Sequence, residues 1–131
     1  NHPNELNPNK RPLHTIIPAM ISKNNNLLGS FGVMGGQYQA AGHAYVLSQM
    51  IDFGLSPQDA LNYPRVYPNN GFLDFENSFD KDVIDELTLR GHKINYPAPL
   101  IGGGQMIFID NDQEILIGAS DWRKDGLAIG Y

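Results

Sequence analysis

The run 27–43 constrains the fold of this chain more than any other stretch. It reads LLGSFGVMGGQYQAAGH, an apolar segment that ends in the pair Gly35-Gly36 and continues into a helical pattern. Glycine adopts positive φ and permits close approach to its backbone, and the start of a helix adds a partial positive charge. Such a strand-to-helix turn suits an anion or a developing oxyanion. On the residues alone, an unliganded structural turn is the simpler interpretation, and both stay open.

Hydrophobic patterning predicts two β-hairpins separated by helices. Strands over 13–22 and 27–34 are expected to pair across the turn 23–26, and strands over 105–109 and 114–118 to form a second hairpin. Apolar residues at steps of three and four predict a mostly buried helix over 39–53. Strands grouped at both ends of a helical middle favour the α+β class over a doubly wound sheet.

Shorter elements lie between the hairpins. Ser56 caps a predicted short helix that ends near Asn62, and Asp80 caps a second helix that stops at Gly91. Short strands are expected over 65–67 and 71–75, whereas 92–100 and 120–131 are expected to be irregular. Residues 1–9 are polar and interrupted by prolines, so we expect an extended lead-in from an upstream segment, followed by one unit over 10–131.

Charge and composition exclude several classes of function. The formal net charge is -5 without a run of lysines or arginines, which argues against binding to nucleic acid or anionic membranes. The chain has no cysteine, so it lacks a thiolate nucleophile and zinc–cysteine ligands. It has neither an apolar run of roughly 18 residues nor a signal-peptide pattern. The expected partner is therefore a small molecule or another protein, and the compartment stays undetermined.

Motifs for cofactors and metals are missing. No glycine run fits the phosphate-binding or dinucleotide-binding spacing, so no cofactor is predicted. The four histidines are scattered without a pair at ligand spacing, and no metal site is predicted (His2, His14, His43 and His92).

Two side-chain constellations offer weaker alternatives. Ser30 or Ser48 with His43 and an aspartate could compose a catalytic triad, but neither serine stands in a nucleophile-elbow pattern. Asp121, Arg123 and Asp125 are expected to form an ion-pair cluster that holds a loop rather than a ligand.

Four blocks in order resemble the C-terminal part of the γ-glutamyltranspeptidase family. They are NKRPLHTIIP at 9–18, FGVMGGQY at 31–38, IDFGLSPQDA at 51–60 with Pro64-Arg65, and SDWRKDGLAIGY at 120–131. The resemblance covers nearly the whole chain. It implies an N-terminal-nucleophile hydrolase: an autoprocessed precursor whose new N-terminal threonine attacks an acyl amide, with the α-amine as base. It also implies part of a four-layer αββα sandwich, with covering helices from Gln39 and Asp80.

The resemblance also implies roles for particular residues. Gly35 and Gly36 correspond to the glycine pair whose N–H groups form the oxyanion hole. His14 and Thr15 stand where transpeptidases have two serines that hold the glutamyl carboxylate. Because this departure changes the pocket, the chain looks more similar to the branch with cephalosporin and glutaryl acylases, and the acyl donor stays open between γ-glutamyl and other acyl groups.

The same resemblance sets expectations for partners. The nucleophilic threonine is absent from this chain, so the isolated chain is expected to be inactive. We expect it to associate with the large subunit and the N-terminal part of the small subunit of the same precursor, or with itself, because unpaired strands leave open edges. The alternative is a non-catalytic binding or assembly module on the same scaffold.

Overall fold

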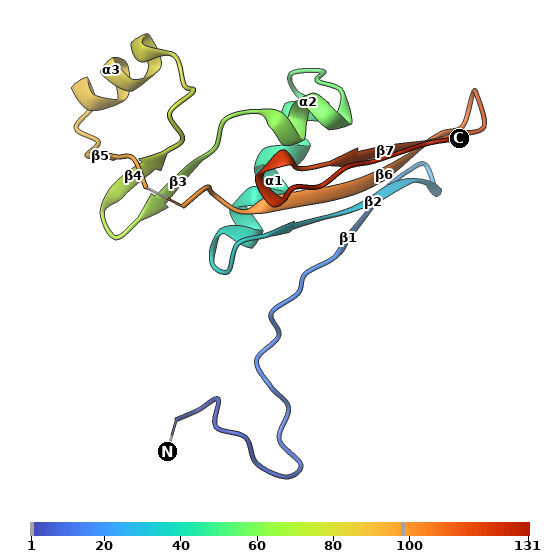
Figure 1. Cartoon of the computed structure of the whole chain (residues 1–131), viewed down its shortest axis with the longest axis horizontal. Coiled ribbons are helices and arrows are strands. Elements are labelled where there is room, and N and C mark those ends of the chain that lie inside the picture. Colours follow the sequence, from blue (N-terminus) through green and yellow to red (C-terminus); the bar gives the residue numbers. More distant parts are fainter. Residues whose placement is uncertain (1, 98) are drawn as a thin grey trace.

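Two hairpins that lie far apart in the sequence join into one four-stranded sheet. The computed structural model describes residues 2–97 and 99–131, so Asn1 of the lead-in and Ala98 lie outside the described residues. The strands β1 (Ala19–Lys23), β2 (Asn26–Met34), β6 (Gly103–Asp110) and β7 (Ile115–Ser120) follow the order β1-β2-β6-β7, and all pairs are antiparallel (Figure 1). Both predicted hairpins are confirmed, and the pairing of β2 with β6 unites them.

The first hairpin turns at Asn24 and Asn25, which both have positive φ (52° and 65°). Two left-handed residues in a row match the twist of the flanking strands, and asparagine tolerates this conformation better than other side chains do. The sequence 23–26 therefore fixes the register of β1 on β2.

The prediction of a strand over 13–22 is wrong for its first half. Residues up to Pro18 run as an extended segment without strand pairing, and β1 begins only at Ala19. Pro18 has no N–H to contribute to a ladder. The segment is tied down by a side chain, since Gln39 Nε2 donates to the Thr15 carbonyl at 2.8 Å.

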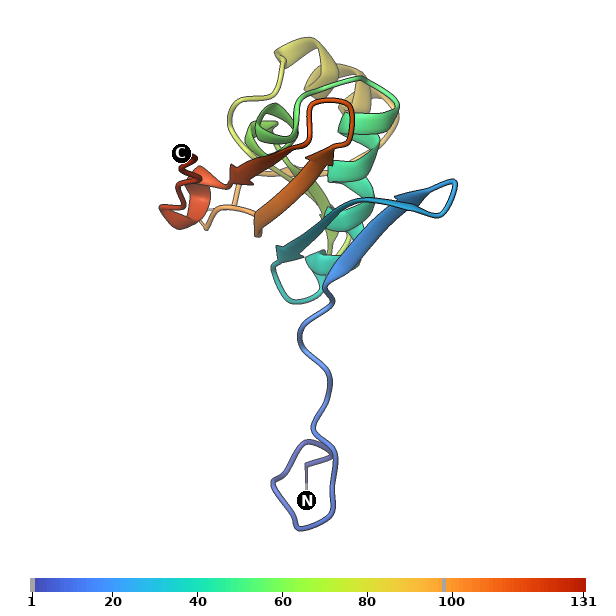
Figure 2. The same ribbon diagram turned by 90° about the vertical axis from the view of Figure 1, so that its right-hand side faces the viewer.

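Two helices cover one face of the four-stranded sheet. They are α1 (Tyr38–Ile51) and α2 (Pro57–Asn62), and Ser56 Oγ caps α2 by accepting from the Asp59 N–H, as predicted. Figure 2 shows α1 running along one face only. The core between the layers contains Phe31, Val33 and Met106 from the sheet, Tyr38 and Val46 from α1, and Ala60 and Leu61 from α2.

The middle of the chain builds a smaller sheet beside the first. Its strands are β3 (Val66–Asn69), β4 (Phe72–Phe75) and β5 (Ile94–Asn95), in that order, and β5 lies parallel to β4. The prediction that 92–100 is irregular missed β5, which is too short for a periodic signal. Pro68 lies inside β3 because this strand is an edge, where a missing N–H is tolerated.

The helix from Asp80 does not belong to the covering layer. This helix, α3 (Lys81–Leu89), lies next to the small sheet and has no buried residue (Figure 1). The expectation that it covers the hairpins is therefore wrong. Asp80 still caps it by accepting from the Asp82 N–H at 3.0 Å, and Gly91 (φ 91°) follows its end.

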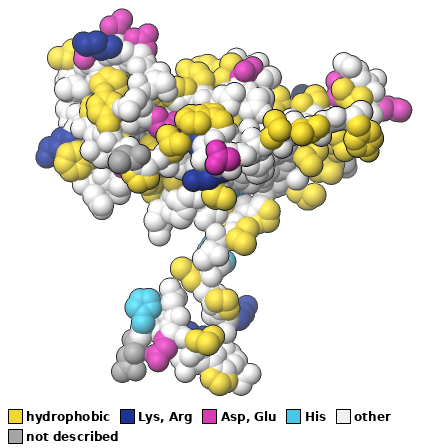
Figure 3. All heavy atoms as spheres, viewed as in Figure 1, with side chains coloured by type: hydrophobic (Ala, Val, Ile, Leu, Met, Phe, Trp, Pro, Cys, Tyr) yellow, Lys and Arg dark blue, Asp and Glu magenta, His cyan; other side chains and the backbone are white. Residues whose placement is uncertain are grey.

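The other face of the four-stranded sheet is open and apolar. Met20, Met34 and Ile107 expose 74%, 55% and 52% of their surface. Hydrophobic side chains also gather at the tips of the two hairpins (right in Figure 3). The C-terminal tail crosses part of this face after η1 (Trp122–Lys124). Among the described residues, no helix is long and apolar enough to span a membrane.

Candidate functional site

The turn between β2 and α1 presents two backbone N–H groups to solvent. Gly35 (φ 137°) and Gly36 (φ 58°) are both exposed, and their carbonyls start the helix by accepting from the N–H groups of Tyr38 and Gln39 at 3.0 and 3.2 Å. Within residues 2–97 and 99–131, neither glycine N–H has an acceptor. Together with the positive end of α1, these donors form a place that suits an oxyanion.

Gly102, directly before the neighbouring strand β6, supports the turn. A Cβ at Gly102 (φ 66°) would lie 2.6 Å from the Met34 carbonyl oxygen and 2.7 Å from the Tyr38 ring, and a Cβ at Gly35 would lie 3.1 Å from Gly102 Cα. Only glycines allow these backbones to approach so closely. The position of the 102–103 segment therefore determines the position of the Gly35-Gly36 turn.

A buried cluster of four charged side chains anchors that segment. Arg65, Glu76, Asp121 and Arg123 are each less than a tenth exposed. Arg65 Nη1 donates to the Ile101 carbonyl at 2.8 Å, the Ile101 N–H donates to Glu76 at 3.1 Å, and the Gly104 N–H donates to Asp121 at 2.8 Å. The cluster thus holds the residues on both sides of Gly102 and Gly103.

The cluster contains two cations and two anions that pair with each other, although Arg65 Nε has no hydrogen-bond partner among the described residues. Arg65 Nη2 pairs with Asp121 Oδ2 at 2.5 Å, and Arg123 Nη2 pairs with Glu76 Oε2 at 2.5 Å. Burial acts to raise the pKa of Glu76, but hydrogen bonds from Arg123 and from the Ile101 and Arg65 N–H groups outweigh it and lower that pKa. Burial acts to lower the pKa of Arg123, and Glu76 and Asp121 reverse this and raise it. Glu76 and Arg123 are therefore both charged near neutral pH.

The prediction of an ion-pair cluster around Asp121 and Arg123 is correct in part. Asp125 stays outside the cluster; it is exposed and adopts a left-handed conformation (φ 51°) after η1. Arg65 and Glu76 were missed, because their partners lie 56 and 47 residues away and no local pattern joins them.

Tyr38 lies beneath the turn without a partner for its hydroxyl. Burial raises the pKa of Tyr38 to about 12, and among the described atoms its OH has no hydrogen bond. Its ring packs edge-on against Tyr67, with centroids 5.4 Å apart, and Arg65 lies 5.9 Å from its centroid. Tyr38 therefore acts as an apolar support that connects the turn to the charged cluster.

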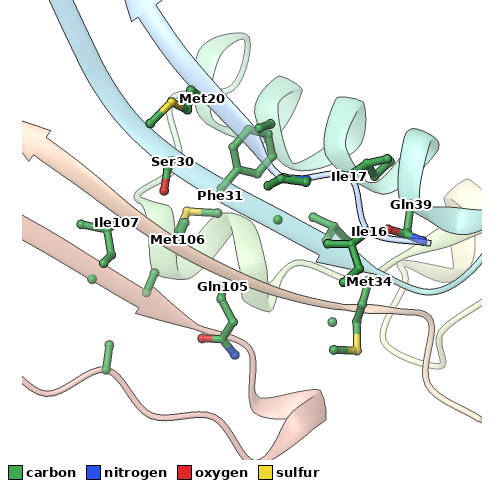
Figure 4. A pocket seen from close by; sticks show the side chains of 18 of the residues that line it. Ile16, Ile17, Met20, Ser30, Phe31, Met34, Gln39, Gln105, Met106 and Ile107 are labelled. Atoms are coloured by element: carbon green, nitrogen blue, oxygen red, sulfur yellow. The ribbon is translucent and has the colours of Figure 1, made fainter. Parts of the chain in front are cut away.

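A groove of about 1130 Å³ opens on the uncovered face of the sheet and reaches Met34, the residue before the turn. Its walls are the segment 15–18, the outward residues of β1, β2 and β6, and the tail at 127–129; Figure 4 shows Ile16, Met34, Gln39 and Gln105 around it. Thr15 lies on the wall of this groove, and Gln39 in the first turn of α1 holds its carbonyl. No local pattern in the sequence pointed to this role of Gln39.

The predicted site residues do not all share one hollow. Thr15 lines the large groove, whereas Gly35 lines a smaller hollow on the other side of Met34. His14 is exposed and lines neither, and Gly36 is open to solvent, with nothing within 4 Å of an added Cβ.

The alternative triad is not assembled. His43 Nε2 accepts from the Val33 N–H at 3.4 Å and Nδ1 donates to the Gln39 carbonyl at 2.7 Å, so both ring nitrogens are used by the backbone. Ser48 Oγ donates instead to Asp52 at 2.6 Å. In the part of the chain that the structure describes, no group of three or more histidine or acidic side chains could hold a metal ion.

Comparisons with known proteins identify relatives over the whole chain. The family model described as Gamma-glutamyltranspeptidase matches residues 1–131. The glutathione hydrolase-like YwrD proenzyme of Bacillus subtilis is 32% identical and aligns with 99% of this chain and 26% of its own length.

Solved structures give the same fold. The cephalosporin acylase of Bacillus halodurans is 42% identical with a TM-score of 0.83, covering 100% of this chain and 26% of that chain. The T380A mutant of Helicobacter pylori gamma-glutamyltranspeptidase is 28% identical with a TM-score of 0.79, covering 90% of this chain and 66% of that chain. The predicted fold class is thereby confirmed. The chain spans about a quarter of the length of the curated relatives it matches, several of which are named proenzymes.

Proposed function

The chain belongs to the gamma-glutamyltranspeptidase family, and we propose that it is the C-terminal segment of an enzyme that cleaves γ-glutamyl or similar acyl amides. The observation that carries the proposal is the turn at Gly35-Gly36, whose two exposed N–H groups lack acceptors within the described residues. In this proposal they bind the oxygen of the scissile carbonyl as it becomes negatively charged.

The nucleophile comes from outside this chain. An N-terminal threonine, generated when the precursor cuts itself, attacks the acyl carbon with its α-amine as base. The amine then leaves, and water or an acceptor amine releases the acyl group from the threonine. Names such as proenzyme among the relatives support a processed precursor.

Thr15 and His14 contribute to the acyl pocket. Thr15 is supported by its place on the groove wall and by the hydrogen bond that fixes its carbonyl to Gln39. A threonine hydroxyl donates one hydrogen bond and accepts others, so it suits the polar end of an acyl group. His14 precedes it on the exposed segment, and a bulky imidazole there changes which acyl group fits.

The rest of the precursor covers the open face of the sheet. Support comes from the exposed Met20, Met34 and Ile107 on that face, since large exposed apolar patches mark interaction surfaces. The covering chains are the large subunit and the N-terminal part of the small subunit; pairing with a second copy is the competing outcome.

An assay of the complete protein tests the proposal. A γ-glutamyl anilide and a glutaryl amide are offered to the purified protein, and release of the amine is measured. We expect release from at least one of them, together with an intact mass that reveals a second chain. Absence of amine release from both substrates would contradict the enzymatic function and favour the non-catalytic module.

A further inference from the structure

His43 is a half-buried titratable side chain to which the proposed reaction gives no role. Its two ring nitrogens contact the backbone on both sides of the Gly35-Gly36 turn: Nε2 lies 3.4 Å from the Val33 nitrogen, and Nδ1 lies 2.7 Å from the Gln39 carbonyl oxygen. Because a backbone N–H can only donate, Nε2 accepts and Nδ1 carries the proton. One ring thus connects the strand before the turn with the first turn of the helix after it.

His43 takes the place of a strand partner at the end of β2. In the register of β1 on β2, Ala19 lies opposite Phe31. The same register, continued along the chain, would bring Ile17 opposite Val33, but the strand pairing has already ended there. Val33 is only 2% exposed, and a buried N–H without an acceptor is costly. The His43 ring, which packs on Phe31 with centroids 4.9 Å apart, supplies that acceptor.

The same ring is linked to the large groove through Gln39. The Gln39 carbonyl accepts from His43, and Gln39 Nε2 donates to the Thr15 carbonyl at 2.8 Å. Thr15 lines the groove, so a continuous set of contacts runs from the end of β2, through His43 and Gln39, to the groove wall. A displacement of the His43 ring would therefore move the turn relative to Thr15.

We propose that His43 is a positioning residue for amide cleavage. It fixes the end of β2 and the start of α1 relative to each other, so that the N–H groups of Gly35 and Gly36 stay aimed at the scissile carbonyl oxygen. Such donors act only within hydrogen-bond distance of the developing oxyanion, and a small displacement lowers the rate. This inference rests on the proposed function, because it needs the oxyanion to form at the turn. His43 itself touches neither the substrate nor the nucleophile.

Two amide substitutions that differ in reach test the inference. In His43→Gln the side-chain amide ends where Nε2 stands, so its oxygen can accept from the Val33 N–H. His43→Asn is one methylene shorter and ends at the position of Nδ1, so it leaves that N–H without an acceptor. Tyr45→Phe is the matched control: Tyr45 is also half-buried on α1, and the substitution removes its hydrogen bond to the Pro64 carbonyl at 2.7 Å.

The measurements use the complete enzyme. They are kcat and KM for whichever of the γ-glutamyl anilide and the glutaryl amide the wild type cleaves. Assembly of the chains is followed by intact mass, and amide hydrogen exchange is followed in the peptide that contains Val33.

We expect His43→Asn to lower kcat by about tenfold and to change KM less. This loss is smaller than that of a removed oxyanion donor, because the two N–H groups shift but remain. Hydrogen exchange at Val33 should become faster in this variant. His43→Gln should retain most of kcat and the slow exchange, and Tyr45→Phe should keep kcat.

Several results would overturn the inference while wild-type turnover still supported the proposed function. They are a kcat of His43→Asn no lower than that of His43→Gln or Tyr45→Phe, unchanged exchange at Val33, and a His43→Asn enzyme that does not assemble, which would make the role of His43 merely structural. Absence of turnover by the wild type would overturn both the proposed function and the inference.

Discussion

Arg65 and Asp121 lie 56 residues apart in the sequence and form an ion pair in which both side chains are fully buried, with Nη2 and Oδ2 2.5 Å apart. Arg65 also binds the Ile101 carbonyl, and Asp121 accepts from the Gly104 N–H. The pair therefore joins the end of α2, the start of β6 and the tail, and it fixes the segment that supports the Gly35-Gly36 turn.

Removing one partner of this pair should be strongly destabilising. Arg65→Met leaves the Asp121 carboxylate buried without its main partner, and breaking a buried pair in this way costs about 3–5 kcal/mol. The free energy of unfolding of the complete protein measures the effect. Lys81→Met removes an exposed pair with Asp85 on α3 and should change stability little. Similar losses of stability in both variants would show that the buried pair contributes no more than the exposed one, which would contradict this prediction.

Glu76 should make stability depend on pH in the acidic range. Its folded-state pKa is lowered from 4.5, so the unfolded state binds the proton more readily. Its contribution is then present above pH 4.5 and is lost as the pH falls through the lower folded-state pKa. Compared with wild type, Glu76→Gln should be less stable at pH 7, and the difference should shrink below pH 4.5. A difference that stays constant across this range would contradict the shift.

Tyr38 should make stability depend on pH in the alkaline range, where stability decreases as the pH rises. Its pKa rises from 10.0 to about 12 in the folded state, so the folded protein keeps the phenolic proton that the unfolded chain loses. The contribution of this proton to the free energy of unfolding is fully present below pH 10 and falls by about 2 kcal/mol as the pH rises towards 12. Tyr38→Phe should therefore lose less stability than the wild type between pH 8 and 11, and it should be at least as stable at pH 8 because the buried hydroxyl has no partner within the described residues. Denaturant titrations at pH 8 and 11 test both statements.

Gly102 should be far less tolerant of a side chain than Gly91. Both have positive φ (66° and 91°), so alanine strains the backbone at each by about 1–2 kcal/mol. A Cβ at Gly102 would also lie 2.6 Å from the Met34 carbonyl oxygen, whereas one at Gly91 meets nothing within 4 Å. Gly102→Ala should therefore lose more stability and also lower kcat by moving the turn, while Gly91→Ala should keep kcat. Equal kcat for both variants would show that Gly102 does not position the turn.

Local signals in the sequence predicted the elements but not how they assemble. Asn24 and Asn25, Ser56 and Asp80 act within a few residues, and the hairpin and both caps they predict are present. The pairing of β2 with β6 and the contacts among Arg65, Glu76 and Asp121 join distant segments, so no spacing reveals them. A local pattern can also mislead. The apolar pattern over 13–22 predicts one strand, but Pro18 has no N–H for the ladder, and the pairing begins only after it.

In the candidate site, too, the sequence reveals local features but not the contacts between distant segments. Gly35 and Gly36 were identified from the strand, the glycine pair and the helix start, which are all local. Their support by Gly102 and the hold of Gln39 on Thr15 depend on side chains and backbones that meet only in the fold.

The most direct test of the account is the kcat for amide cleavage of the Gly36→Val variant of the complete enzyme. A β-branched residue does not tolerate the φ of 58° at Gly36, so the backbone must rotate and its N–H must leave the carbonyl oxygen. Gly54→Val is the control, because Gly54 (φ 70°) lies just after the end of α1, and an added Cβ there meets nothing within 4 Å. We predict that Gly36→Val lowers kcat by about a hundredfold or more while the chains stay assembled, and that Gly54→Val retains kcat. Unchanged turnover by an assembled Gly36→Val enzyme would contradict the oxyanion role of the turn.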